Sequence, residues 1–322
     1  MDTKIINVLV TGVGSELAFG IIKALKLSSL NIKIYGVDVY PEVVGKNWCD
    51  EFYQVSYASD IVGYEKDLRK IINDKNIEIL IPSVDQEFVF LAKIKHSLFI
   101  DYNCHVLINE IDEINLFNDK WFAHLWFKKN QIGSPETFLT ESFNDNSING
   151  DEFIIKPRTG GGSRNIFKFS SLKELNSLKE VVPNPIIQTI LLPDNEEYTA
   201  TVFQTKKNEL NSILFRRTLK FGMTNTAEVV DDKNLKNFVE DIVRKSNLLG
   251  SNNIQFRNTQ DGPKLLEINP RFSGTVGIRA NFGFNDVEYW IKDVLNLPQD
   301  FPKINIKKGF VLRFMEEQYH FI

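Results

Sequence analysis

Cysteine is nearly absent from this sequence, and histidine is scarce. The 322 residues include two cysteines and four histidines. Cys49 and Cys104 are too few for a disulfide framework, and neither belongs to a Cys-x-x-Cys pair or has a histidine at ligand spacing. We therefore expect two free thiols, and we expect neither a zinc centre nor a cysteine–histidine catalytic pair.

Long apolar runs and an excess of one charge are also missing. No stretch approaches the length of a bilayer span, and the first residues do not form a signal peptide. Lys and Arg number 38 and Asp and Glu 42, so the net charge of −4 gives no overall attraction to nucleic acid. We therefore expect a cytoplasmic protein with no membrane partner and no nucleic-acid partner.

The first third of the chain alternates short apolar runs with helical patterns. Runs at residues 5–10, 32–38, 77–81 and 105–108 predict the strands of a Rossmann-like α/β domain over residues 1–110. Gly12, Gly14 and Asp38 are compatible with dinucleotide binding, but Leu17 stands where a third glycine is expected. We favour a tight turn that binds no nucleotide, and the sequence leaves open whether this domain binds any ligand.

A glycine-rich hairpin follows the predicted strand at residues 151–157. That strand carries Lys156 near its end, and the next residues include Gly160, Gly161, Gly162 and Ser163. Backbone N–H groups of such a hairpin can surround a triphosphate while the lysine bonds phosphate oxygens. No Gly-Lys-Ser/Thr sequence follows, so this is not a Walker loop. The alternative is a mobile surface hairpin.

Two further segments carry polar groups beside predicted strands. Between the apolar strand at 185–192 and the alternating strand at 196–203, backbone groups can meet a flat base and Glu197 can bind ribose hydroxyls, although Glu197 could equally be a solvated strand residue. After a strand predicted at 212–215 come Arg216, Arg217 and Lys220, which either receive an anionic substrate or form a solvated face.

The most informative stretch is the predicted strand that ends with Glu267, Asn269 and Arg271. Residues two apart in a strand point to the same face, so the carboxylate and the amide project together. Such oxygen groups suit Mg²⁺, and Arg271 can fork onto phosphate oxygens. Gln255 is expected on the adjacent antiparallel strand. The alternative is a strand end whose polar groups are solvated or pair with each other.

In chain order these features resemble the ATP-grasp superfamily, most closely the proteins similar to carbamoyl-phosphate synthase large-subunit domains and biotin carboxylase. The resemblance covers nearly the whole chain. It implies an α/β fold, α+β in the grasp part, with a Rossmann-like preATP-grasp domain at residues 1–110. A small lid subdomain at 111–190 and a large subdomain with the metal site at 191–322 would follow.

The resemblance also implies a role for each matching position. ATP phosphates would contact Lys120 and Lys156 under the lid formed by Gly160, Gly161, Gly162 and Ser163. Adenine would lie at Gln188 and the backbone of Thr189, Ile190 and Leu191, and ribose at Glu197. Mg²⁺, for which Mn²⁺ could substitute, would be held by Gln255, Glu267 and Asn269, and Arg271 would steady the transferred phosphoryl group. Gln188 and Gln255 depart from the family, which often has acids there.

The implied activity is ATP-dependent carboxylate–amine ligation of small molecules through an acyl phosphate. Candidates to hold the acid's carboxylate are Arg216, Arg217, Lys220, Arg257 and Arg279. Little sequence follows the grasp region, so we expect no fused amidotransferase or biotin-carrier domain. The family often forms homodimers, although nothing in the sequence identifies an interface.

Two alternatives stay open. One is an ATP-binding regulatory or scaffold protein that keeps the fold without turnover. The other is a nicotinamide-dependent oxidoreductase, which rests only on Gly12, Gly14 and Asp38. The sequence does not predict which acid or amine is used.

Overall fold

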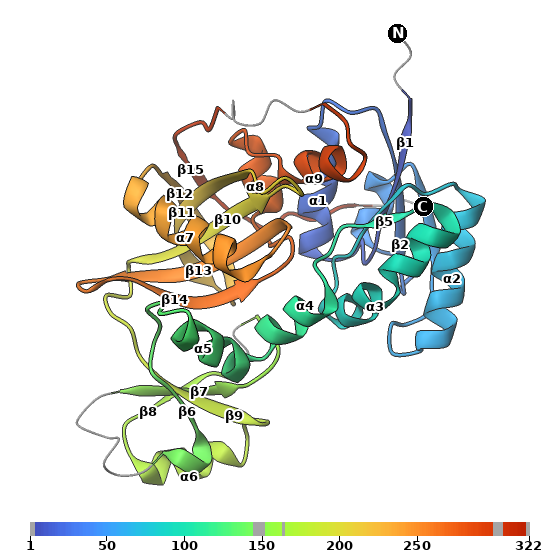
Figure 1. The fold of residues 1–322 in the computed structure, drawn as a ribbon. Coiled ribbons are helices and arrows are strands. Elements are labelled where there is room, and N and C mark those ends of the chain that lie inside the picture. Colours follow the sequence, from blue (N-terminus) through green and yellow to red (C-terminus); the bar gives the residue numbers. More distant parts are fainter. Residues whose placement is uncertain (1–3, 144–151, 163–164, 299–304, 320–322) are drawn as a thin grey trace.

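Three sheets organise the computed structural model, which describes residues 4–143, 152–162, 165–298 and 305–319 (Figure 1). One sheet is parallel with five strands, and the other two are antiparallel with four and six strands. This mixture of a parallel α/β part and antiparallel α+β parts confirms the predicted fold class.

The N-terminal sheet has the strand order β3-β2-β1-β4-β5. Its strands are β1 (Ile6–Val10), β2 (Ile32–Asp38), β3 (Glu51–Gln54), β4 (Ile79–Ile81) and β5 (His105–Val106). Its helices are α1 (Glu16–Lys26), the short 3-10 helix η1 (Val44–Trp48), α2 (Ile61–Asp74) and α3 (Asp85–Tyr102). The sheet is buried on both faces, which explains the continuous apolar runs of its inner strands. The polar strand β3 was not predicted.

A separate lobe at the bottom of Figure 1 carries the four-stranded sheet, in the order β6-β9-β7-β8. Two helices lead into it, α4 (Ile111–Asn118) and α5 (Lys120–Lys129). The lobe contains β6 (Thr137–Leu139), η2 (Thr140–Ser142), β7 (Phe153–Pro157), β8 (Phe167–Phe169), α6 (Leu172–Lys179) and β9 (Pro185–Thr189). Phenylalanines and leucine from β7, β8 and α6 form a small core of its own, so this lobe packs largely on itself.

The six-stranded sheet has the order β14-β13-β10-β11-β12-β15. Its strands are β10 (Glu197–Gln204), β11 (Leu210–Lys220), β12 (Met223–Val230), β13 (Gly250–Thr259), β14 (Gly262–Asn269) and β15 (Phe310–Leu312). Its helices are α7 (Lys233–Ser246), α8 (Val276–Asn281) and α9 (Asp286–Val294). β11 runs past the predicted end at residue 215, so the Arg216–Arg217 pair lies within a strand.

The N-terminal sheet and the six-stranded sheet share one hydrophobic core. α1 of the first packs directly on α8 of the second, and two glycines lie at their crossing. A Cβ on Gly20 would lie 2.7 Å from Cγ1 of Val276 and 3.1 Å from the backbone nitrogen of Gly277. Only a residue without a side chain allows the helices to approach this closely, so the crossing fixes how the two sheets sit.

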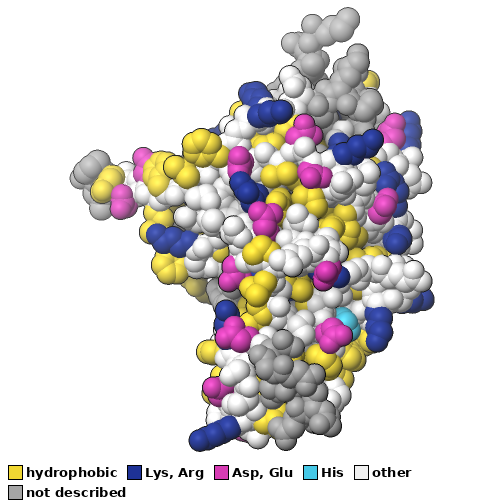
Figure 2. Space-filling model, turned by 90° about the vertical axis from the view of Figure 1, so that its left-hand side faces the viewer, with side chains coloured by type: hydrophobic (Ala, Val, Ile, Leu, Met, Phe, Trp, Pro, Cys, Tyr) yellow, Lys and Arg dark blue, Asp and Glu magenta, His cyan; other side chains and the backbone are white. Residues whose placement is uncertain are grey.

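The surface carries both signs of charge. Basic and acidic side chains are interspersed over the face in Figure 2 and do not separate by sign. Among the described residues, no helix is both long enough and apolar enough to cross a bilayer.

Candidate functional site

A β-bulge presents Glu267 and Asn269 on one face of β14. Gln255 pairs with Glu267 and Phe256 pairs with Leu265, so Leu266 is an extra residue in β14. Because of this extra residue, Leu265 and Ile268 both reach the core although they lie three apart. Strict alternation would place Glu267 on the buried side with Leu265. The bulge turns the carboxylate away from the core.

The segment after β14 brings Arg271 to the N-terminal domain. Nη2 of Arg271 lies 3.2 Å from Oδ1 of Asp85, and the guanidinium carbon lies 5.2 Å from the centre of the Phe88 ring. A cavity of about 80 Å³ lies here. Its polar lining includes Asp85, Gly160, Gly161, Glu267, Asn269 and Arg271. Asp85 was not predicted. Its position could have indicated a site residue, because Asp85 follows the carboxyl end of β4. Ligands of parallel sheets bind at the edge where the carboxyl ends of the strands meet.

Two lysines lie near this cavity, Lys120 at the start of α5 and Lys156 on β7. Nζ of Lys120 donates to the carbonyl of Gly160 at 2.6 Å, and Gly160 has a φ of +92° that favours glycine. Burial lowers the pKa of Lys156 to about 8, although the carboxylate of Glu267 opposes the shift and Lys120 adds to it. The predicted lid residues Gly161 and Gly162 are described, whereas Ser163 lies outside the described residues.

The hinge between β9 and β10 combines a buried amide with backbone groups. Nε2 of Gln188 donates to Oγ1 of Thr137 at 2.8 Å, while its buried Oε1 has no hydrogen-bond partner among the described residues. The N–H of Thr189 bonds the carbonyl of Glu136 at 3.0 Å, and that of Ile190 bonds Glu152 at 3.4 Å. An unpaired buried acceptor can receive a donor from a ligand.

Glu197 lies between two arginines on the same sheet. Its Oε1 accepts from Nη2 of Arg217 at 3.0 Å, and its Oε2 accepts from Nη2 of Arg257 at 2.8 Å. The three side chains are between 9% and 16% exposed. Nη1 of Arg257 also donates to the carbonyl of Leu191 at 2.6 Å, which ties the hinge to the cluster. All three line a groove of about 670 Å³.

Arg217 also bonds Gln255, which the sequence suggested as a metal ligand. Nη2 of Arg217 donates to Oε1 of Gln255 at 2.9 Å, and Nη1 lies 3.4 Å from Oγ1 of Thr224. The neighbouring Arg216 lines the same groove but has different partners. It pairs with Glu228 at 2.8 Å and with Glu196 at 3.5 Å, and it is 47% exposed. The two adjacent arginines therefore differ in their contacts and in their exposure.

One divalent cation fits the oxygens near the bulge. No hydrogen bond joins the side chain of Glu267 or Asn269 to another described residue, although Glu267 interacts electrostatically with Lys156. A carboxylate and an amide therefore line the cavity. Mg²⁺ is usually held by one or two protein groups, with phosphates and water completing its shell. A cluster of three or more His, Cys, Asp or Glu suited to a metal does not occur among the described residues. The donor set thus suits an ion that arrives with a phosphate.

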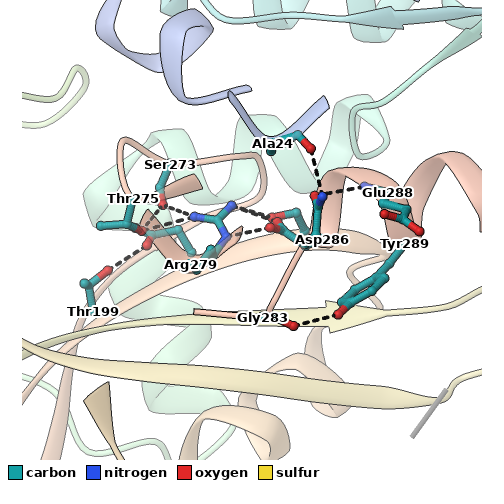
Figure 3. Close-up of polar contacts among 12 residues, drawn as sticks. Ala24, Thr199, Ser273, Thr275, Arg279, Gly283, Asp286, Glu288 and Tyr289 are labelled. Atoms are coloured by element: carbon teal, nitrogen blue, oxygen red, sulfur yellow. Dashed lines mark hydrogen bonds and ion pairs between the residues drawn. The ribbon is translucent and has the colours of Figure 1, made fainter. Parts of the chain in front are cut away.

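A buried ion pair fixes the loop that follows Arg271 (Figure 3). Arg279 and Asp286 are both fully buried, and two N–H···O bonds of 2.6 and 2.7 Å join them. Nη1 of Arg279 also donates to the hydroxyls of Ser273 and Thr275, each at 3.1 Å. The candidate assignment of Arg279 to a substrate carboxylate is therefore wrong, because its donors are used inside the protein.

Asp38, at the end of β2, binds the turn that follows β1. Asp38 accepts the N–H of Gly14 at 2.8 Å and that of Tyr40 at 3.1 Å. Both carboxylate oxygens thus hold backbone groups, and the residue is buried. The nicotinamide hypothesis needs this carboxylate for a ribose, so it loses its main support.

Comparison with known proteins extends these observations. Residues 183–317 match a family described as ATP-grasp in the biosynthetic pathway with Ter operon. A curated relative, tetrahydromethanopterin:alpha-L-glutamate ligase of Methanocaldococcus jannaschii, is 25% identical over 178 residues. That alignment covers 51% of this chain and 61% of the relative.

Solved structures share the fold over nearly the whole chain. The biotin carboxylase domain of Hydrogenobacter thermophilus 2-oxoglutarate carboxylase, bound to MgADP, ADP and bicarbonate, has a TM-score of 0.72 at 15% identity and covers 94% of this chain and 73% of its own. N5-carboxyaminoimidazole synthetase from Staphylococcus aureus with ADP has a TM-score of 0.71 at 16% identity, covering 95% and 80%. These comparisons confirm the predicted resemblance: the chain shares the fold of these proteins, and residues 183–317 match a family model described as ATP-grasp.

Proposed function

We propose that the protein is an ATP-dependent carboxylate–amine ligase that works through an acyl phosphate. The observation that carries the proposal is the meeting of lid and sheet at one cavity. Gly160 and Gly161 from the lid, and Glu267, Asn269 and Arg271 from β14 and its following loop, all line it. The ligase name of the curated relative and the nucleotides bound in the structural neighbours support this assignment.

The nucleotide would extend from the hinge to the bulge. Adenine would meet Gln188 and the hinge backbone of Thr189, Ile190 and Leu191, with the free Oε1 of Gln188 as an acceptor. Ribose would lie beside Glu197, and the phosphates would lie under Gly160–Gly162 near Lys120 and Lys156. Glu267 and Asn269 would hold Mg²⁺, which supplies positive charge for the phosphate oxygens when bound.

The reaction needs little covalent help from the protein. A carboxylate oxygen of the acid attacks the γ-phosphorus, the bond to the β-phosphate oxygen breaks, and ADP leaves with the electron pair. The amine then attacks the acyl carbon, phosphate departs, and the amine loses a proton to solvent. Lys156 and Arg271 stabilise charge on the transferred group, and the lid excludes water that would hydrolyse the acyl phosphate.

ADP release with Mg·ATP against a panel of amino, hydroxy and sugar acids tests the proposal. Each acid is offered with and without an amine mixture. We expect one acid to stimulate release, and we expect Glu267→Ala to abolish the stimulation. Glu42→Ala is the matched control, because Glu42 is exposed, pairs at the surface with Lys46 and lines neither the cavity nor the groove. Tight ATP binding without acid-dependent release across a broad panel would favour the regulatory or scaffold alternative.

Several expectations stay predictions at this stage. They are the domain boundaries at residues 110 and 190, the substitution of Mn²⁺ for Mg²⁺, a homodimer, and a cytoplasmic location. The identity of the acid and the amine follows from the panel.

A further inference from the structure

We propose that Arg217 replaces one of the metal ions expected in this site, so that the protein binds ATP with a single divalent cation. The inference rests on the proposed function and concerns the same site. It begins from a disagreement: the resemblance assigns Gln255, Glu267 and Asn269 to magnesium ions, but the donors around Gln255 do not suit a second ion.

The oxygen that Gln255 would offer to a metal is already used. Its Oε1 accepts a hydrogen bond of 2.9 Å from Arg217. The amide is also neutral, so a second Mg²⁺ would share Glu267 as its only nearby carboxylate in this strand pair. Glu197, the next acid along the sheet, has both oxygens bonded to arginines. The position therefore lacks the negative charge that attracts a hard cation.

A fixed positive charge occupies this place instead. Arg217 and Arg257 are balanced by Glu197 and by the exposed Asp194, which meets Nη1 of Arg257 at 2.8 Å, but the charge that lies against Gln255 is the guanidinium of Arg217. A second Mg²⁺ beside Gln255 would lie next to the guanidinium of Arg217 and would be repelled by it. Phosphate oxygens, in contrast, would be attracted by the same guanidinium.

The position of Arg217 allows its guanidinium to supply the positive charge of a metal ion. Glu197, Gln255 and Thr224 hold the guanidinium from three sides, and its side chain is 9% exposed. A guanidinium is charged at all relevant pH values and its fork matches phosphate oxygens. Because protein contacts already orient it, the charge is in position before the nucleotide arrives. Arg217 thus acts on the phosphates and does not hold the acid's carboxylate.

Counting bound Mn²⁺ tests the proposal without knowledge of the acid or the amine. Mn²⁺ is titrated into wild-type protein saturated with a non-hydrolysable ATP analogue, and free Mn²⁺ is followed by electron paramagnetic resonance. We expect one Mn²⁺ per chain that depends on the nucleotide. Two such ions would overturn this inference and leave the ligase proposal standing. A failure of the wild-type protein to bind the analogue at all would overturn both.

Two variants extend the test. Arg217→Met should still bind one Mn²⁺ but should bind the analogue at least tenfold more weakly, because a positive charge is lost. Arg217→Met combined with Gln255→Glu should bind two Mn²⁺ and recover much of the affinity. Glu197 keeps Arg257 as a partner in both variants, and a melting curve checks that each folds. If Arg217→Met binds the analogue as well as the wild type, Arg217 does not act on phosphate.

Discussion

The six-stranded sheet and its helices contain two clusters of arginine–carboxylate ion pairs, one closed inside the protein and one open to a groove. The Arg279–Asp286 pair is fully buried and balanced, with one positive charge for one negative charge. The Arg217–Glu197–Arg257 cluster is also balanced, because the exposed Asp194 pairs with Arg257, but it is open to a groove. Among the described residues, Nε of Arg257 is buried without a hydrogen-bond partner.

This difference in access distinguishes an ion pair that stabilises the fold from arginines that can bind a ligand. The donors of Arg279 that contact the loop end on hydroxyls of Ser273 and Thr275, so the pair has nothing to offer a ligand and instead holds the loop. The open cluster presents its arginines to a groove beside the proposed nucleotide site. Access to a groove therefore indicates the role of an arginine better than its charge balance alone.

Breaking the closed cluster should give the largest effect. Arg279→Met leaves the carboxylate of Asp286 buried without its partner, which should lower the free energy of unfolding by about 3–5 kcal/mol. Urea denaturation measures this change. Lys46→Met is the control, because Lys46 pairs with Glu42 at an exposed site and should change stability by less than about 1 kcal/mol. Equal effects of the two variants would show that the buried pair has no structural role.

Raising the pH should weaken nucleotide binding through Lys156. The pKa of Lys156 is lowered to about 8 in the free protein, so its charge is lost as the pH rises through that value. Phosphate binding favours the charged form, and the affinity for Mg·ADP should therefore fall about tenfold between pH 7 and 9 and stay level below pH 7. Calorimetric titration measures it. Lys156→Arg stays charged in this range, and an unchanged pH profile in that variant would contradict the assignment.

The lid glycines should give a smaller effect. Gly160 and Gly262 both have positive φ, +92° and +95°, and a Cβ at either would meet no atom within 4 Å. Replacing either by alanine should cost about 1 kcal/mol of local strain. Only Gly160→Ala should also weaken Mg·ADP binding, by a few fold, because its strain falls on the lid. Equal binding by both variants would remove the lid from the proposed site.

The sequence predicted the arrangement of the fold because its signals are local. Apolar runs, helix periodicity and the Pro270 stop gave the strand and helix order, and residues 255 and 267 were placed on paired strands, which the register confirms. The sequence also predicted that Glu267 and Asn269 project together, but not that they project away from the core. The bulge at Leu266 that frees Glu267 from the core depends on the partner strand, which a single strand pattern does not contain.

The partners of charged side chains were not predictable in the same way. Arg279 and Arg217 look alike in the sequence, yet one pairs with Asp286 in the core and the other with Glu197 and Gln255 at the groove. Asp85 meets Arg271 across a sequence gap that spans the whole lid lobe. Such pairs are set by how the three sheets assemble, so no spacing in the chain reveals them.

The smallest expected effect separates two adjacent arginines. Arg216 is 47% exposed and bonds Glu228, which is 55% exposed, so Arg216→Met should change the free energy of unfolding by less than about 1 kcal/mol. It lines the same groove as Arg217 but bonds Glu228 and not Gln255, and Mg·ADP binding should stay within twofold of the wild type in a calorimetric titration. Arg217→Met, one residue away, should weaken nucleotide binding clearly. Similar losses in both variants would mean that general positive charge, and not the oriented Arg217 guanidinium, attracts the nucleotide, and the contrast between closed and open clusters would then reduce to net charge.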